Sequence, residues 1–362
     1  MTQENYISYL VGTVNGYPAK LQRHLKKLFT DAGITVPDEQ MKIPLGVDTT
    51  VSIKDKELSD QLTGCLEQSE SAQRIFEKWE FEKDYKYSVL FTSPQFNTLL
   101  SKVDSLVQYD KTCSEAPRSS NDFTDPLCLK DGNFVFLKFI VYYSAVEPAT
   151  GNEFLLKYPI LIVLHCKEQI IEFRFDTLRR IFVPERQEQT FYSDLISKLI
   201  HFCQTFFGVN ISPLNLEFLK KHHPDATLMA KYMMLPSGGN AQLDVGKNEN
   251  YILPIIGELR TILDNHRNEL DAVPSLKESL EQFMFENDEL SECSWIEIMW
   301  ENEIKVRSIR VKFIFNYKNH DYCLLQHYYS NVLVGMERMN HVVRYINEHQ
   351  NDVQQESNTD GF

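Results

Sequence analysis

The chain has 362 residues, of which 43% are hydrophobic and 12% are aromatic, so it holds enough apolar material for two or three folded domains and is not intrinsically disordered. Its 37 basic and 51 acidic residues give a formal net charge of -14. Such a charge repels phosphate backbones and anionic membranes, so nucleic acid is a disfavoured partner except at a local basic patch.

Seven cysteines are scattered along the chain without a C-x-x-C pair. Cys65, Cys166, Cys203 and Cys323 lie in apolar segments, where a thiol acts as a small core residue. This pattern predicts reduced thiols and a cytoplasmic location. The first residues lack a basic start followed by an apolar stretch, and no apolar run approaches the roughly 20 residues of a membrane span. We therefore expect neither an export signal nor a membrane anchor.

The amino-terminal part combines helical and strand patterns. After a strand-like start, residues 18–33 predict a helix that begins at a proline, buries leucines on one face and ends at Gly33. Its other face carries Lys20, Arg23, His24, Lys26 and Lys27. A second helix is expected from about residue 52 or 55 to residue 79, followed by a strand at 87–91. Residues 110–131 are rich in Ser, Pro, Asp and Asn, which predicts a linker or exposed loop.

The central part begins with three β-rich runs, "FVFLKFIVYYSAV", "EFLLKYPILIVLHC" and "QIIEFRFDTL", joined by short connections. This spacing predicts an antiparallel meander. Residues 190–207 then place aromatic and aliphatic side chains at helical spacing before Gly208, so a helix should cover the meander. Two further helices are expected, at 254–270 and at 275–285, where Ser275 and Glu278 form a capping box.

The carboxyl-terminal part repeats the order of strands followed by a helix. The runs "SWIEIMW", "IKVRSIRVKFIFNY" and "YCLLQHYYS" precede a helix at 334–348 with Met336, Met339, Val343 and Ile346 facing inward. The sequence thus predicts an α+β fold with a mixed amino-terminal region (1–125), a central meander with covering helices (126–272) and a carboxyl-terminal meander plus helix (273–362). Whether the two meander units are a duplication stays open.

The segment "LPSGGNAQLDVGKNENY" raises the question of a phosphate-binding loop. A Walker loop needs G-x-x-x-x-G-K-[ST] between a strand and a helix. Here Gly246 and Lys247 are followed by Asn248, and Ala241 occupies the place of the first glycine. The motif fails at both positions, so this segment is predicted to be a turn, and no cofactor is expected.

Catalytic and metal-binding patterns are weak throughout. His320, Cys323 and His327 lie on a predicted strand, where Cys323 and His327 would be about 13 Å apart at a rise of ~3.3 Å per residue, too far to share one zinc ion. No metal site is therefore expected. The alternative that stays open is a metal-dependent nuclease or other nucleic-acid-processing enzyme. It would use Glu303 and Lys305 with an upstream carboxylate such as Glu297.

Two surface features indicate binding. The basic helix face, with Lys20, Arg23 and Lys27, is a candidate for anion or nucleic-acid contact. The carboxyl-terminal aromatics, Trp295, Trp300, Tyr317, Tyr322, Tyr328 and Tyr329, favour a protein interface over nucleic acid, because they are not interleaved with a strong basic pattern. Arg310, Tyr328 and Tyr329 are the predicted partner-binding residues, since exposed aromatics beside arginine are typical of interface hot spots.

Taken together, the missing catalytic motifs, the acidic charge and the aromatic-rich strands favour binding over chemistry. The sequence predicts a non-catalytic cytoplasmic interaction or regulatory subunit of a multiprotein assembly, with another protein subunit as its partner. A microbial defence or DNA-maintenance complex would be one setting for such a subunit.

Overall fold

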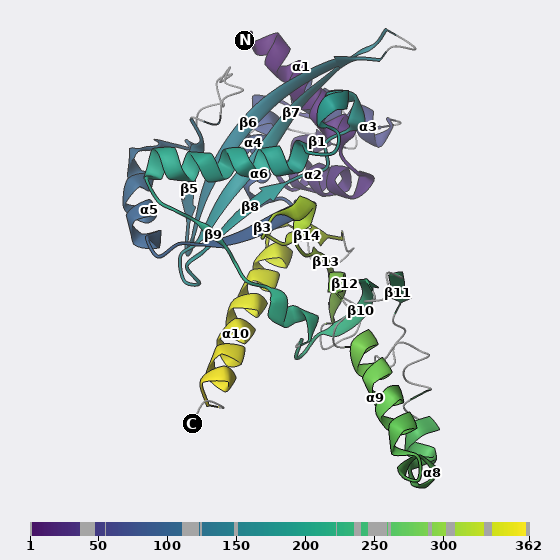
Figure 1. Cartoon of the computed structure of the whole chain (residues 1–362). Coiled ribbons are helices and arrows are strands. Elements are labelled where there is room, and N and C mark those ends of the chain that lie inside the picture. The colour runs from purple at the N-terminus through teal and green to yellow at the C-terminus, as the bar shows by residue number, and fades with distance from the viewer. Residues whose placement is uncertain are drawn as a thin grey trace. The chain divides into compact units, whose positions relative to one another are not determined.

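The computed structural model describes residues 2–36, 48–54, 56–110, 123, 125–147, 151–221, 223–234, 240–244, 259, 262–288, 292–301, 308–328 and 335–359. The chain forms two compact units, Met1–Leu214 with Asn331–Asn347 and Asn215–Ser330 with Glu348–Phe362. Figure 1 labels their elements. The division into three domains at 1–125, 126–272 and 273–362 stays a prediction. The boundaries of the two compact units fall at other residues.

The first unit contains a mostly antiparallel sheet. Its strands are β3 (Tyr87–Thr92), β4 (Val107–Gln108), β5 (Leu127–Asp131), β6 (Phe134–Val146), β7 (Glu153–His165), β8 (Ile170–Phe175) and β9 (Ser212–Pro213). The order across the sheet is β9-β3-β8-β7-β6-β5-β4, and only the β4–β5 pair is parallel. The predicted antiparallel meander of β6, β7 and β8 is confirmed. Part of the predicted loop at 110–131 is instead strand β5, because its apolar residues pair with β6.

Helices cover both faces of this sheet (Figure 1). On one face lie α1 (Gln3–Gly16) and α4 (Glu70–Glu82), and on the other lies α6 (Phe191–Phe202). The ring centres of Phe202 on α6 and Phe139 on β6 are 4.9 Å apart. The predicted helix before Gly208 is confirmed, with a last π-helical turn at Cys203–Phe207. Because both faces are covered, residues 157–165 of β7 are buried without alternation.

The remaining elements of this unit are α2 (Ala19–Asp31), α3 (Leu58–Gln68), α5 (Phe96–Lys102) and a short parallel pair of β1 (Thr35–Val36) and β2 (Val51–Ser52). Helix α2 confirms the predicted helix at 18–33. The beginning of α10 (Glu337–Thr359) also belongs here, and Met339 packs in a core cluster with Phe81, Tyr85 and Phe136. Met339, Val343 and Ile346 are buried, as their spacing predicts.

Two helix predictions in the first unit were wrong. The first residues of the chain, which were predicted to form a strand, form helix α1. Tyr6, Leu10 and Val14 lie four residues apart and are all buried, which is helical spacing. The single helix predicted to end at residue 79 is two helices, α3 and α4. The break falls at Ser69, which leaves α-helical geometry and caps α4 by accepting a hydrogen bond from the Ala72 amide.

The strands of the second unit pair in the order β11-β10-β12-β13-β14, each antiparallel to its neighbour. The strands are β10 (Thr227–Met234), β11 (Asn240–Asp244), β12 (Glu292–Glu301), β13 (Ser308–Ile314) and β14 (Leu324–His327). The predicted carboxyl-terminal meander of β12, β13 and β14 is confirmed. Strands β10 and β11 were not predicted, and β10 pairs with β12 in this sheet.

Among the described residues between the strands of the second unit are helices α8 (Arg267–Asp271) and α9 (Pro274–Asp288). Helix α9 confirms the prediction at 275–285. Of the helix predicted at 254–270, residues 262–265 and 267–270 are helical with a turn at residue 266, whereas residues 254–258, 260 and 261 lie outside the described residues. Lys247 and the glycines before Asn240 also lie outside them. No described helix is both long and apolar enough to cross a membrane.

Candidate functional site

Strands β12 and β13 divide their side chains between two different faces. Opposed residues share a face, so Ile296, Ile298, Val311 and Phe313 form a buried side. The other side carries Trp295, Glu297, Met299, Arg310 and Lys312. One face of this sheet therefore builds the core of the second unit, while the other presents aromatic and charged side chains.

The second face arranges its aromatic and cationic side chains in contact. The Lys312 ammonium lies 3.4 Å from the centre of the Trp295 ring, and Tyr232 of β10 stacks on that ring at 6.0 Å with an interplanar angle of 10°. The Arg310 guanidinium lies 5.1 Å from the centre of the Tyr328 ring. We call Tyr232, Trp295, Arg310, Lys312 and Tyr328 the aromatic–cation face.

The electrostatics of this face are mixed. Arg310 forms an ion pair with Glu297, which lies opposite Lys312 in the register. Partial burial lowers the pKa of Lys312. Arg310 nevertheless keeps 46% of its side chain exposed, and the four other residues of the face are half-buried. Each cation over a ring contributes about 0.5–1 kcal/mol at such exposed positions, so these contacts favour one arrangement of the side chains on this face.

Two of the three predicted partner-binding residues, Arg310 and Tyr328, thus lie side by side, and the Tyr328 amide also donates to the Arg310 carbonyl. Tyr329 lies outside the described residues. Tyr322 and Trp300 are buried instead of exposed. The interface role of Arg310, Tyr328 and Tyr329 stays a prediction.

The predicted basic face on α2 is smaller than its sequence suggests. The Lys20 ammonium lies 3.6 Å from the Asp84 carboxylate, and burial lowers the pKa of Lys20. His24 accepts a hydrogen bond from the indole of Trp79 at 3.3 Å. Arg23 and Lys27 are exposed. Anion contact by Lys20, Arg23 and Lys27 stays a prediction, and only Arg23 and Lys27 offer exposed charge for it.

Of the three predicted catalytic residues, Glu297 alone lies in the described part of the chain. Glu303 and Lys305 lie outside the described residues. Glu297 is buried in its ion pair with Arg310. No group of three or more His, Cys, Asp or Glu side chains that would hold a metal ion occurs in the part of the chain that the structure describes.

The described cysteines are free thiols. Burial raises the pKa of Cys65 and Cys203 to about 12 and that of Cys128 to about 11. Cys166 is only half-buried, unlike the core position predicted for it. Since the thiolate is the reactive form, Cys65, Cys128 and Cys203 are unsuited to nucleophilic chemistry.

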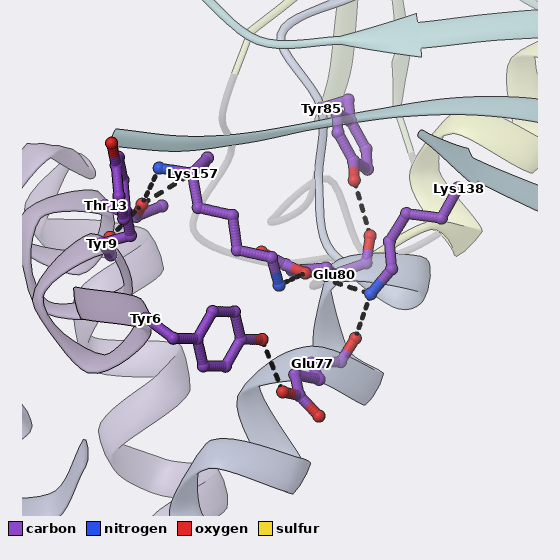
Figure 2. Close-up of polar contacts among 8 residues, drawn as sticks. All are labelled: Tyr6, Tyr9, Thr13, Glu77, Glu80, Tyr85, Lys138 and Lys157. Carbon is purple, nitrogen blue, oxygen red and sulfur yellow. Dashed lines mark hydrogen bonds and ion pairs between the residues drawn. The ribbon is translucent and has the colours of Figure 1, made fainter. Parts of the chain in front are cut away.

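The first unit contains a buried charged cluster that the sequence did not predict (Figure 2). One oxygen of the Glu80 carboxylate accepts hydrogen bonds from Lys157 at 2.7 Å and from Lys138 at 3.0 Å. Lys138 also donates to the Glu77 carbonyl at 2.8 Å, and the Tyr6 hydroxyl donates to the Glu77 carboxylate at 2.5 Å. All five side chains are fully buried.

This cluster joins four elements of the first unit. Glu77 and Glu80 lie one turn apart on α4, Lys138 and Lys157 come from the neighbouring strands β6 and β7, and Tyr6 comes from α1 (Figure 2). Two carboxylates and two ammonium groups sum to zero charge, so each ion is compensated where it has lost its hydration. The signal in the sequence was a lysine inside each of two otherwise apolar strand runs, since lysine is almost never buried unless paired.

A second buried group lies on the same face of the sheet. The Glu172 carboxylate on β8 accepts from Arg174 at 2.6 Å and contacts His165 at 2.8 Å, and Arg174 also donates to the Asn340 side chain of α10 at 2.6 Å. Burial alone would raise the pKa of Glu172, but Arg174 and His165 hold it well below its usual range. These charges attach helices to the sheet.

No protein-family model matches this chain, and no curated protein is similar enough to count as a relative.

Proposed function

We propose that the chain is a non-catalytic interaction or regulatory subunit that binds another protein through the aromatic–cation face of its second unit. The observation that carries this proposal is the half-exposed arrangement of Tyr232, Trp295 and Tyr328 with Lys312 and Arg310 over their rings. Ordered aromatics beside arginine lose little conformational freedom on binding and are enriched among interface hot spots.

The buried charges of the first unit support the same proposal. Glu80, Lys138 and Lys157 are fully buried and paired with one another inside the fold, so they serve attachment of helices better than proton transfer to a substrate. The described cysteines are free, which agrees with the reducing cytoplasm as the proposed location. A multiprotein assembly in microbial defence or DNA maintenance is our proposed setting.

The test is affinity purification of the tagged chain from its native host, followed by quantitative mass spectrometry. The unaltered chain should retain a stoichiometric protein partner. Arg310→Ala combined with Tyr328→Ala should weaken capture by about 30-fold, since losing a hot spot costs ~2 kcal/mol or more. Arg186→Ala is the matched control, because Arg186 is an exposed arginine of the first unit.

Thermal melting of each variant separates a binding effect from unfolding. If the double variant melts like the unaltered chain and still captures the partner as well as Arg186→Ala does, the aromatic–cation face is not the interface. Loss of a cellular activity by Glu303→Ala, with capture intact, would instead favour the enzyme alternative.

A further inference from the structure

Helix α9 exposes an apolar stripe that the aromatic–cation face does not include. Leu276, Leu280, Phe283 and Met284 occupy positions i, i+4, i+7 and i+8, which places them on one side of a helix. Leu276 and Phe283 are each 49% exposed, and Leu280 and Met284 are half-buried. None of the α9 side chains that the structure describes is buried.

A short helix with an exposed apolar stripe has little stability by itself. Isolated helices of about 12–15 residues are marginal in water, and most helical stability in proteins comes from packing of the apolar face. Helix α9 has 15 residues. An exposed apolar stripe with polar borders is typical of a surface that another helix covers.

The charges on α9 indicate which kind of helix would fit. Glu281 and Glu286 border the stripe on opposite sides, and Glu278 lies on the back of the helix. The lysine of α9, Lys277, is matched by Asp271 at 2.8 Å. The helix therefore presents excess negative charge along an apolar stripe.

We propose that α9 binds an amphipathic helix of a partner protein whose apolar stripe is bordered by lysine or arginine. Opposite charges along both borders would add to the burial of the apolar stripe. A second copy of this chain fits less well, because pairing α9 with itself brings the glutamates of one copy near those of the other. This surface is separate from the aromatic–cation face, so either proposal can fail without the other.

The experiment uses the full chain and a synthetic probe. The probe is a fluorescent 18-residue peptide with leucines at helical a and d positions and lysines beside them, and the matched control peptide carries glutamate in place of lysine. Fluorescence anisotropy should show saturable binding of the lysine peptide that weakens as salt rises, and no binding of the glutamate peptide.

Substitutions on the two sides of α9 test the stripe itself. Leu276→Gln with Leu280→Gln removes apolar contact while keeping a good helix former, and should weaken binding about tenfold or more. Phe285→Gln is the matched control, because Phe285 is 51% exposed but lies half a turn from Leu276 around the helix. It should leave the affinity within about twofold.

Three outcomes would overturn the proposal. They are equal binding of both peptides, equal losses from the Phe285 and Leu276/Leu280 variants, and concentration-dependent self-association of the chain without peptide binding. Circular dichroism of each variant checks that its helix content is unchanged. Failure of the peptide to bind leaves the partner capture expected of Arg310 and Tyr328 to be judged by its own test.

Discussion

At the scale of single residues, the buried lysines of the first unit are its most unusual feature. Lys138 and Lys157 lie on strands whose other residues are mainly apolar, yet both ammonium groups are fully buried. Taking a charged group out of water costs several kcal/mol, which only close counter-charges and hydrogen bonds offset. Glu80 supplies the charge for both lysines, and Lys138 also lies 4.2 Å from the centre of the Phe81 ring.

Replacing Lys138 by methionine tests how much this cluster contributes to the free energy of unfolding. The change keeps the length of the side chain but removes a cation that pairs with Glu80. Breaking a buried pair by removing one partner is strongly destabilising, so the free energy of unfolding should fall by about 3 kcal/mol. Urea denaturation measures this change. Lys167→Met, at an exposed turn between β7 and β8, is the control and should change it by less than about 0.5 kcal/mol.

Glu172 should make the stability of the chain sensitive to acid. Arg174 and His165 hold the pKa of Glu172 below its usual range in the folded state, so folding favours the ionised carboxylate. The resulting stability is present above the unfolded pKa of about 4.3 and is lost as pH falls from there towards the folded pKa.

Glu172→Gln removes this titrating group. The variant should be less stable at neutral pH, and its unfolding free energy should fall less steeply than that of the unaltered chain between about pH 5 and pH 2. Urea denaturation at a series of pH values measures both effects. Identical slopes would show that Glu172 does not contribute to the acid sensitivity.

At the scale of elements, the contact between α1 and β7 depends on a glycine. A Cβ atom built on Gly12 would lie 2.0 Å from the Leu155 carbonyl oxygen, a distance that real side chains do not reach. Gly12→Ala should therefore push α1 away from β7 and lower the melting temperature by several degrees, about 2–4 °C for each kcal/mol lost.

Gly16→Ala is the matched substitution at the end of the same helix. A Cβ atom built there meets nothing within 4 Å. Alanine also loses less conformational freedom than glycine on folding, so this variant should be unchanged or slightly stabilised. Equal melting temperatures for the two variants would contradict the close approach of α1 to β7.

The break between α3 and α4 shows how an element boundary can be missed. The apolar spacing of Leu58, Leu62, Cys65 and Leu66 continues smoothly towards Trp79, so periodicity alone predicts one helix. Asp48 accepts hydrogen bonds from the Ser69 hydroxyl and the Glu70 amide at the start of α4. A carboxylate from a distant segment thus fixes the new helix end, which no local pattern of apolar residues reveals.

At the scale of the whole molecule, the two compact units carry different features. The first unit concentrates the buried ion pairs that hold helices on its sheet. The second unit carries both surfaces that we propose for binding, the aromatic–cation face and the stripe on α9. The sequence placed partner binding in the carboxyl-terminal part, and that assignment remains to be tested by the capture experiment.

Much of the fold followed from sequence patterns. The meander of β6, β7 and β8, the covering helix α6 and the meander of β12, β13 and β14 were all predicted from apolar periodicity and turn residues. Strands β10 and β11 were missed, because they lie beside segments of mixed turn-like composition and the pairing of β10 with β12 is not local.

The candidate sites were also predicted only in part. The alternation along β13 indicated that Arg310 lies on the face opposite the buried Val311, and this agrees with the burial pattern of the strand. The contact between Arg310 and Tyr328 depends on the pairing of two strands. The cluster of Glu80 with Lys138 and Lys157 depends on the packing of helix α4 against strands β6 and β7.

The sequence by itself determined the α+β class, the helical and strand periods and the alternation that separates core from surface on β13, because these follow from local geometry and apolar spacing. Only the tertiary structure decided which charges are buried and how they are paired. Glu77 and Glu80 are separated from Lys138 by about 60 residues and from Lys157 by about 80. The physical reason is that an ion pair is set by distance in space, which the chain determines only once its helices have packed on its sheet.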